Sequence, residues 1–349
     1  MSSSFIRADV RTRLRTHVAL VAHIAACVLL AACVRVTARA SSSGSGLGTV
    51  ATPTRSSATA DHVPRIVILS AFDPELVKLR AATRITSTRV VNGRTMYLGT
   101  LAGHDVVLML SGFSMVNAAM TTQALLDRFT VRGIVFSGIA GGVNPGLAIG
   151  DVTVPAQWGN YQENVFARAT ATGFEPARTT TPFANFGMMY TQGTSVTVRG
   201  AAPDSLDRRF WFSADSTALA TSAQIAARVH LTRCLPTGEC LSREPRIVVG
   251  GNGVSGPTFV DNAAYREWAW NTFHADALDM ETAAVAVVAY ENRVPFIAFR
   301  SLSDLAGGGP GENEARLFGR LAADNSAAVV MEFLRALPSS GAWASSARR

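Results

Sequence analysis

The sequence predicts an α/β domain, because apolar segments of strand length alternate with helical segments along most of the chain. Three times an apolar strand segment is followed by a turn of small residues, which is how an α/β sheet builds a site at the carboxyl edge of its strands. The composition agrees with this class. Of the 349 residues 48% are hydrophobic and 16% are charged, which suits one large domain or two modest ones.

The periodicity of the apolar residues predicts the elements in chain order. Short β-branched runs indicate strands, and a proline near the first turn indicates the start of a helix. The predicted strands are 65–69, 105–110, 133–136 and 246–249, the predicted helices start at 72 and span 115–129, and the small-residue turns are 70–71, 111–114 and 137–142.

The stretch from about 157 to 244 is less regular and holds Trp158, Tyr161 and the aromatic cluster 210–212. We interpret it as an elaboration over the sheet edge, where the aromatic residues form either a lid or ordinary packing. The whole domain is predicted to span 62–338, and 339–349 is predicted to be a disordered tail.

The N-terminal region has the pattern of an export signal. Arginines at positions 7, 11, 13 and 15 precede an uncharged stretch, 18–32, which ends in small residues before Cys33. This pattern resembles a bacterial lipobox, so 1–32 would be a signal peptide, Cys33 the lipidated first residue and 33–61 a flexible tether. A plain signal peptide and an uncleaved anchor are the alternatives, although the apolar run is short for a membrane span.

We therefore expect an exported protein, periplasmic or in the cell envelope, that meets the membrane only through its N-terminal lipid. The signal region holds four Arg and one Asp, so its removal lowers the formal charge from +7 to about +4. No nucleic-acid-binding face is expected from that charge.

The four cysteines divide between two regions. Cys27 and Cys33 lie in or at the end of the signal region, whereas Cys234 and Cys240 flank a turn-rich spacer. In an oxidising compartment we expect Cys234 and Cys240 to form a disulfide, with two free thiols as the alternative. No metal site is expected, because the six histidines are scattered and none pairs with the cysteines at ligand spacing.

The sequence argues against a dinucleotide-binding loop, a Walker loop and a serine hydrolase elbow. The segment 251–256 matches Gly-x-Gly-x-x-Gly, but the residues that follow it have no helical pattern, so a bent or flexible loop explains it better than a dinucleotide site. The sequence has no Walker loop and no Gly-x-Ser-x-Gly elbow, which argues against the usual nucleoside triphosphatases and serine hydrolases. No cofactor is expected.

Three ionisable side chains stand against otherwise apolar sequence. Glu281 opens an Ala/Val-rich helix, and Arg300 and Asp304 follow the apolar run 295–299. Charges at the edge of a core are costly unless they are used, which makes these residues functional candidates. The structural alternatives are a buried Glu281–Arg300 ion pair, a turn cap at Asp304 and, for Glu75, a first-turn glutamate favoured by the helix dipole.

Four segments together resemble the sequential motifs of the nucleoside phosphorylase superfamily, and most closely its methylthioadenosine/S-adenosylhomocysteine nucleosidases. They are 111–119, 137–142, 279–284 and 300–304, within a resemblance that spans 65–337. The segment 259–267 and the cysteine pair resemble the secreted plant bark-storage-like members. The resemblance implies a three-layer phosphorylase-type α/β fold with a mixed, partly barrel-like central sheet flanked by helices. Dimers are common in this branch, so a homodimer is a further expectation.

The resemblance also implies catalytic roles. Glu75 falls where the nucleosidases carry the base that activates water, Arg300 and Glu281 where they hold that water and the ribose hydroxyls, and Asp304 where an acid protonates N7 of the purine. These residue types suit a reaction through an oxocarbenium-like state, in which a carboxylate faces the sugar while an acid neutralises the leaving base.

Further substrate-binding positions follow from the same resemblance, although each apolar one could instead belong to the core. Met280 would pack on the ribose, Phe259 would stack on the purine beside the Val260 backbone, Phe72 and Phe113 would line the pocket for the 5′ substituent, and Ser303, Ala140 and Gly141 would complete the site.

The expected activity is hydrolysis of a purine nucleoside, with methylthioadenosine, S-adenosylhomocysteine or adenosine as candidates. A phosphorylase needs cations around its phosphate, whereas this chain places Glu75 near the nucleophile and offers no cation within 111–114. A phosphate-dependent phosphorylase and a catalytically weak binding or storage-like protein remain the alternatives. Ile139 departs from the family pattern, because nucleosidases usually have a serine there near the catalytic water.

Overall fold

The computed structural model describes residues 61–178, 182–337 and 343. The predicted signal peptide, Cys33 and all of the tether before residue 61 lie outside the described residues, as does the predicted tail apart from Trp343. Trp343 is buried and packs edge-on against Phe333, at 5.7 Å between ring centroids. Among the helices of the described ranges, none is long and apolar enough to cross a membrane.

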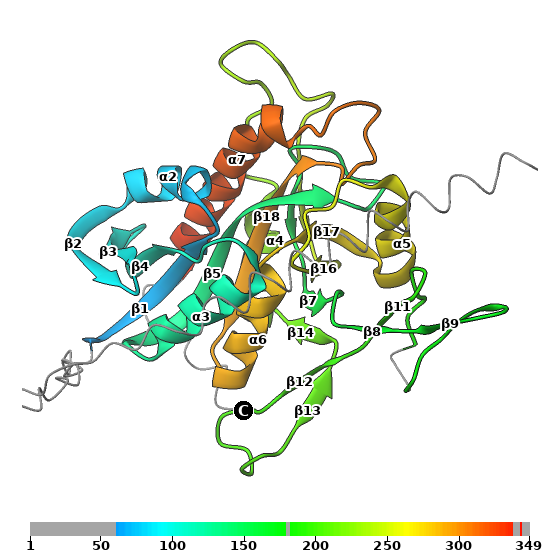
Figure 1. Ribbon diagram of the computed structural model, residues 1–349. Helices are drawn as coiled ribbons and strands as arrows, with labels where there is room; N and C mark the ends of the chain where they lie inside the picture. Colours follow the sequence, from blue (N-terminus) through cyan, green and yellow to red (C-terminus); the bar gives the residue numbers. More distant parts are fainter. Residues whose placement is uncertain (1–60, 179–181, 338–342, 344–349) are drawn as a thin grey trace, which may run out of the picture. The chain divides into compact units, whose positions relative to one another are not determined.

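A twelve-stranded mixed sheet forms the centre of the described domain (Figure 1). Its main path runs β14-β7-β16-β17-β5-β1-β4-β3-β2, and β18, β6 and β15 branch from it. The strands are β1 (Asp61–Ser70), β2 (Arg84–Val91), β3 (Arg94–Leu101), β4 (His104–Leu110), β5 (Phe129–Gly142), β6 (Val152–Val154), β7 (Gln157–Asn160), β14 (Trp211–Ser213), β15 (Ile247–Val249), β16 (Asn252–Ser255), β17 (Ala275–Asp279) and β18 (Phe296–Asp304).

Part of this sheet closes into a barrel. Strand β5 pairs with β18 on one side and with β17 on the other, β18 pairs with β6, and β17 pairs with β16. Because β6 leads directly into β7 and β15 into β16, the pairings β6·β15 and β7·β16 complete the ring. The mixed, partly barrel-like sheet expected from the sequence is therefore confirmed.

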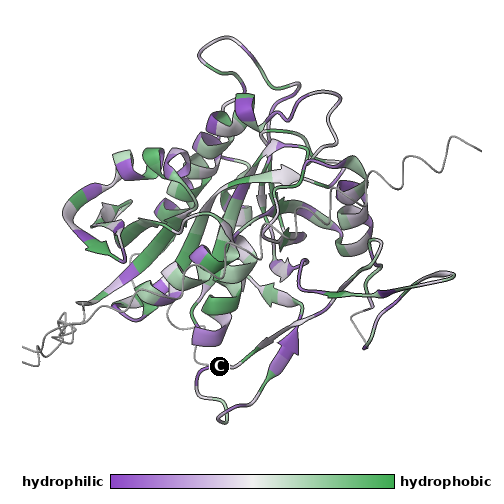
Figure 2. Ribbon diagram, in the orientation of Figure 1, coloured by the Kyte–Doolittle hydropathy of each residue, from purple (hydrophilic) through white to green (hydrophobic). Residues whose placement is uncertain are grey.

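Helices cover both faces of the open part of the sheet and make it a three-layer structure. One face carries α2 (Asp73–Ala82), α4 (Ser216–Ala226) and α7 (Ala315–Ala336), the other carries α3 (Ser114–Leu126) and α6 (Thr282–Asn292), and α5 (Ala263–Phe273) lies beside β17. The alternation of side chains along β1 separates the two cores. Ile66 and Ile68 join the core that contains α7 residues, and Val67 and Leu69 join the core that contains α3 and α6 residues. The central strands are correspondingly coloured as hydrophobic in Figure 2.

Strand β5 continues through the segment 137–142, for which the sequence predicted a turn. That prediction was wrong, because glycines in this segment are needed for close approach rather than for bending. A Cβ at Gly138 would overlap the side chains of Arg300 and Glu75, which cross the strand at this point. The strand is thus glycine-rich where charged groups lie against its backbone.

The segment predicted as an elaboration is only partly separate from the sheet. Its strands β7 and β14 belong to the central sheet, whereas three small two-stranded sheets lie outside it. These are formed by β8 (Asn164–Phe166) with β11 (Met189–Thr191), β9 (Arg168–Thr170) with β10 (Gly173–Glu175), and β12 (Thr194–Val196) with β13 (Asp207–Arg209).

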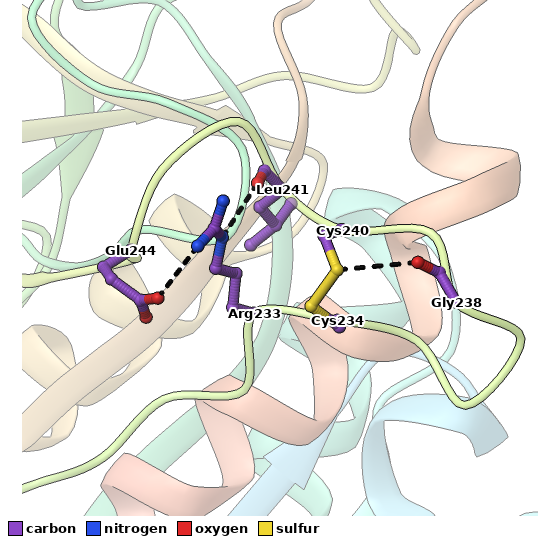
Figure 3. The surroundings of a disulfide bond; sticks show 6 residues. All are labelled: Arg233, Cys234, Gly238, Cys240, Leu241 and Glu244. Carbon is purple, nitrogen blue, oxygen red and sulfur yellow. Dashed lines mark hydrogen bonds and ion pairs between the residues drawn. A yellow bond between two sulfur atoms is a disulfide. The ribbon is translucent and has the colours of Figure 1, made fainter.

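The structure links Cys234 to Cys240 by a disulfide at the surface (Figure 3). Within the same loop Arg233 donates hydrogen bonds from Nε to the Leu241 carbonyl at 3.1 Å and from Nη1 to Glu244 at 3.3 Å. None of these residues lines the candidate active site described below.

Candidate active site

A pocket opens where β1, β5, β17 and β18 end and where α2, α3, α6 and α7 begin. Its innermost cavity has a volume of about 180 Å³. It is lined by Ala71, Phe72, Glu75, Phe113, Ile139, Ala140, Gly141, Thr258, Phe259, Val260, Leu278, Asp279, Met280, Glu281, Ser303, Asp304 and Ala315. Every catalytic or substrate-binding residue proposed from the sequence therefore lines this pocket, except Arg300, which lies buried behind it.

None of the described residues between 157 and 244 lines the pocket, so this segment forms no lid over it in the structure.

Glu75 lies in the first turn of α2 and is 2% exposed. Its Oε2 accepts a hydrogen bond from the Ala71 amide at 2.6 Å, and its Oε1 accepts one from the Ile139 amide at 2.8 Å. Burial raises the pKa of this carboxyl, while Arg300 and the backbone donors act in the opposite direction. The group is held rigidly and keeps an affinity for a proton, which suits a general base.

Arg300, on β18, is fully buried among three carboxylates. Its Nε lies 2.7 Å from Asp279 Oδ2, whereas Nη1 is 3.6 Å from Glu75 and Nη2 is 3.8 Å from Glu281. The guanidinium also stacks over the ring of Phe136, at 4.1 Å from its centroid. Three acidic groups thus share one buried cation.

Glu281 is the N-cap residue of α6 and is 5% exposed. Its Oε1 accepts a hydrogen bond at 2.7 Å from the amide of Ser114, a non-glycine residue with a φ of 72°. Such a conformation is uncommon outside glycine and often accompanies function. Burial, followed by the nearby charge of Asp279, raises the pKa of Glu281 to about 7.

This raised pKa predicts a pH dependence of stability. The carboxyl of Glu281 has an ordinary pKa of 4.5 and one of about 7 in the folded protein, so the folded state binds the proton more tightly. Its contribution to stability is full below pH 4.5 and is lost as the pH rises to about 7. We expect Glu281→Gln to flatten the fall of the unfolding free energy across this window in urea titrations. Glu267→Gln, an exposed position on α5, should not; equal slopes for Glu281→Gln and the wild type would contradict the assignment.

Asp304 is the last residue of β18 and lines the same pocket as Glu75. Its Oδ1 accepts a hydrogen bond from the Ala306 amide at 2.8 Å, and its Oδ2 accepts one from the Ser303 hydroxyl at 2.8 Å. Burial raises its pKa, and the Ser303 hydrogen bond partly offsets that effect. A carboxyl that retains its proton to a higher pH can act as a general acid.

Aromatic side chains form the outer wall of the pocket. Phe72 and Phe113 stack on each other with ring centroids 5.1 Å apart. Phe113 is 57% exposed and Phe259 is 61% exposed, which is unusual for phenylalanine and leaves their rings available to a ligand. A wider chamber of about 620 Å³ continues outward past Phe72 and Phe259 to the charged residues Asp261, Glu312 and Arg316.

The structure adds polar groups to which the sequence reasoning gave no role. Asp279 accepts hydrogen bonds from the hydroxyls of Ser255 and Thr282 and from the amides of Glu281 and Thr282. It lies two residues before Glu281, the N-cap residue of α6, and a carboxylate beside a helix N-terminus is a signal that could have identified it. Strand pairing of β16 with β17 brings Ser255 beside it, which no local pattern shows.

The sequence reasoning also missed Arg94, because no local pattern shows which residues it meets in the fold. It lies on β3, and its guanidinium packs against Gly112, where a Cβ would stand 2.7 Å from Arg94 Nη2. Its Nη2 donates a hydrogen bond to Asn117 at 2.8 Å. The turn 111–114, which lacks a cation of its own, therefore has one beside it. In the ranges that the structure describes, no group of three or more His, Cys, Asp or Glu residues is placed to hold a metal ion.

Comparison with known proteins gives a family match and relatives that agree with each other. A family model described as the phosphorylase superfamily matches residues 65–335. A 5′-methylthioadenosine/S-adenosylhomocysteine nucleosidase of Tolumonas auensis is 32% identical over 275 residues, which are 78% of this chain and 100% of that protein.

Solved structures agree with these matches. The nucleosidase of the same name from Colwellia psychrerythraea, in complex with adenine, has a TM-score of 0.59 and 25% identity, covering 80% of this chain and 97% of that one. A futalosine hydrolase of Helicobacter pylori has a TM-score of 0.58 at 20% identity, covering 79% of this chain and 99% of that one. Since proteins named for different substrates share this fold, the fold by itself does not select a substrate.

Proposed function

Because this chain belongs to the phosphorylase superfamily, we propose that its pocket hydrolyses the N-glycosidic bond of a purine nucleoside and releases the free base. Methylthioadenosine, S-adenosylhomocysteine and adenosine are the candidate substrates. The observation that carries the proposal is the presence in one pocket of two buried carboxyls with raised pKa values, Glu75 and Asp304, on separate elements. Cleavage of a glycosidic bond requires a base for water and an acid for the leaving group.

In this mechanism Glu75 removes a proton from water, and the water attacks the anomeric carbon of the ribose. Glu281 accepts hydrogen bonds from the ribose hydroxyls, and Asp304 donates its proton to N7 of the departing purine. The exposed ring of Phe259 offers a stacking surface for the base, with Val260 at its edge and Met280 against the sugar. Ile139 contributes through its backbone, because its amide holds Glu75 and its carbonyl accepts a hydrogen bond from Arg300 at 3.4 Å. A serine hydroxyl at position 139 is therefore not needed to orient Glu75, the catalytic base.

Phosphorolysis is the second candidate, and Arg94 is the observation that favours it. A guanidinium beside Gly112 could attract an anion to the turn before α3. Against this, the anionic form of Glu75 would repel phosphate at the nucleophile position, and the Ser114 amide in that turn is already bonded to Glu281. Hydrolysis remains the better account of the site.

The deciding experiment incubates the purified domain with a panel of purine nucleosides, with and without phosphate, and measures free base, free sugar and ribose 1-phosphate. We expect base release at the same rate in phosphate-free buffer, with free sugar as the product. Strict dependence on phosphate would replace this proposal by the phosphorylase one. Absence of base release under both conditions would favour a binding or storage-like protein.

We also propose that the protein is exported and anchored through a lipid on Cys33. The arginine-rich start followed by an uncharged run supports export, and a surface disulfide suits an oxidising compartment. The intact mass of the membrane-associated protein tests this, because a mature chain that starts elsewhere or carries no lipid would refute the anchor.

A further inference from the structure

The buried part of the site contains more negative than positive charge. Asp279, Glu281 and Glu75 surround the single guanidinium of Arg300, and all four groups are at most 5% exposed. The arrangement is unequal, because Arg300 is within hydrogen-bond distance of Asp279 but only within ion-pair distance of the two glutamates. One carboxylate is thus the main partner of the cation, and it is the one to which the mechanism above gives no role.

We propose that Asp279 is a positioning residue that holds Arg300 by its Nε edge, so that Glu75 stays free of a direct hydrogen bond from the guanidinium and available to activate water. This inference rests on the proposed function, since it concerns how the catalytic base is kept basic.

The bonding of Asp279 fits an anchor that is held in place from several sides. Both of its oxygens accept hydrogen bonds, Oδ1 from the Ser255 hydroxyl and two amides at the start of α6, and Oδ2 from the Thr282 hydroxyl. Oδ2 also forms the ion pair with Arg300. A carboxylate with this many donors has little freedom to turn away from Arg300. The N-terminus of α6 adds the positive end of its dipole.

Thr282 completes the clamp on the guanidinium. Its hydroxyl oxygen accepts hydrogen bonds from Arg300 Nε at 2.9 Å and Nη2 at 2.8 Å while its proton goes to Asp279. Two adjacent nitrogens of the rigid guanidinium are fixed in this way, and its plane is then set. The remaining nitrogen, Nη1, faces Glu75 from 3.6 Å, a distance that polarises the carboxylate without occupying its lone pairs.

The electrostatic consequence concerns the pH at which the base becomes ionised. The charged groups facing Glu75 and Glu281 are Arg300 on β18, Asp279 on β17 and each other, and Asp304 lines the same pocket. The nearby charges of α2 are engaged outside it, with Asp73 paired to Arg80 and Lys78 bonded to the Asp324 carbonyl. Because Asp279 lies against Arg300, its negative charge opposes the attraction that Arg300 exerts on the two glutamates.

Asp279→Asn tests the inference, because it nearly preserves shape but removes the charge. The uncompensated Arg300 should then favour ionised Glu75, so the acid limb of the kcat profile should move to lower pH by about one unit or more. At pH 7 kcat should fall by roughly 10- to 100-fold as the base weakens. Asp279→Glu, which keeps the charge, should leave the acid limb within a few tenths of a unit of the wild type, whatever its effect on kcat.

Two more variants separate positioning from a general structural role. Thr282→Val removes the hydroxyl that holds Arg300 but keeps the charges of Asp279 and Arg300. It should move the acid limb of the kcat profile to lower pH, by less than Asp279→Asn does. Asp276→Asn is the matched control on the same strand, because Asp276 is 6% exposed and bonded to Asn144 rather than to Arg300. It should leave the limb in place. A fall in kcat with an unmoved acid limb in both Asp279→Asn and Thr282→Val would overturn the proposal.

A second readout does not depend on catalysis. The infrared carbonyl band of protonated buried carboxyls can be followed against pH in wild type and Asp279→Asn. We expect the wild-type band to persist to about pH 7, the value for Glu281, and to vanish at lower pH in the variant. If the carbonyl bands of the wild type and Asp279→Asn titrate at the same pH, the inference is wrong even if the enzyme is active. If the band of the variant is shifted but the wild type releases no purine base, the inference is supported and the proposed function is refuted.

Discussion

Asp304→Asn is expected to lower kcat for base release by about 100-fold or more, while nucleoside binding and folding are largely kept. The carboxyl is buried and its pKa is raised, so the wild-type group can carry the proton that the leaving purine needs. Asparagine has nearly the same shape and can still accept a hydrogen bond from Ser303 or Ala306, but it has no proton to transfer. Steady-state kinetics with a nucleoside that the wild type cleaves would measure the change.

Asp261→Asn is the matched control for this substitution. Both aspartates are within 3.4 Å of the side-chain amide of Asn313, but Asp261 lies in the outer chamber and not in the inner pocket. We expect Asp261→Asn to retain a rate near that of the wild type. Wild-type turnover in Asp304→Asn would remove the general acid from the mechanism.

Glu75→Gln is expected to reduce hydrolysis by a similar or larger factor, on the order of 100- to 10,000-fold, because an amide cannot take a proton from water. The substitution also has a predicted structural cost. Both carboxylate oxygens of Glu75 accept backbone hydrogen bonds, from Ala71 and Ile139, so the amide nitrogen of a glutamine must face one of these donors. Leaving a buried donor unpaired costs about 1–3 kcal/mol of stability.

Kinetics and thermal unfolding of Glu75→Gln should therefore change together. Asp73→Asn supplies the comparison, since Asp73 begins the same helix but is exposed and paired with Arg80 at 3.0 Å. That variant should keep its activity. If Glu75→Gln is as active as the wild type, Glu75 is not the base, and a folded Glu75→Gln that no longer binds nucleoside would assign it to binding instead.

The local pattern of the sequence was sufficient for the α/β class, and the family resemblance supplied most of the pocket residues. The runs of β1 and β4 alternate between two buried faces, and that pattern requires helices on both sides of a sheet. The small-residue segments after these strands correctly marked the edge where Glu75, Phe113 and Asp304 now lie together. These features are local, since each depends on residues adjacent in the chain.

The sequence prediction failed where a segment's conformation depends on distant partners. The segment 137–142 has the composition of a turn, but β18 pairs along it and extends β5 to Gly142. The hairpin of β2 and β3 was also overlooked, although Asn92 and Gly93, with φ angles of 50° and 74°, form the turn signal between them. For 137–142 the pairing with β18 overrode the local composition. For the β2–β3 hairpin the local Asn-Gly signal was present but was not used.

Which charges interact was decided by the tertiary structure alone. The sequence identified Glu281, Arg300 and Asp304 as charges beside apolar runs, which followed from the cost of burying them, whereas Glu75 was identified through the family resemblance. It could not rank their interactions, because Glu75 and Arg300 are separated by more than two hundred positions and meet only through the pairing of β5 with β18. The structure makes Asp279 the main partner of Arg300 and brings Arg94 to Gly112. The ion pair of Arg300 with Asp279, at 2.7 Å, is shorter than those with Glu75 and Glu281, at 3.6 and 3.8 Å. Such differences are set by the packing of whole elements rather than by any local pattern of residues.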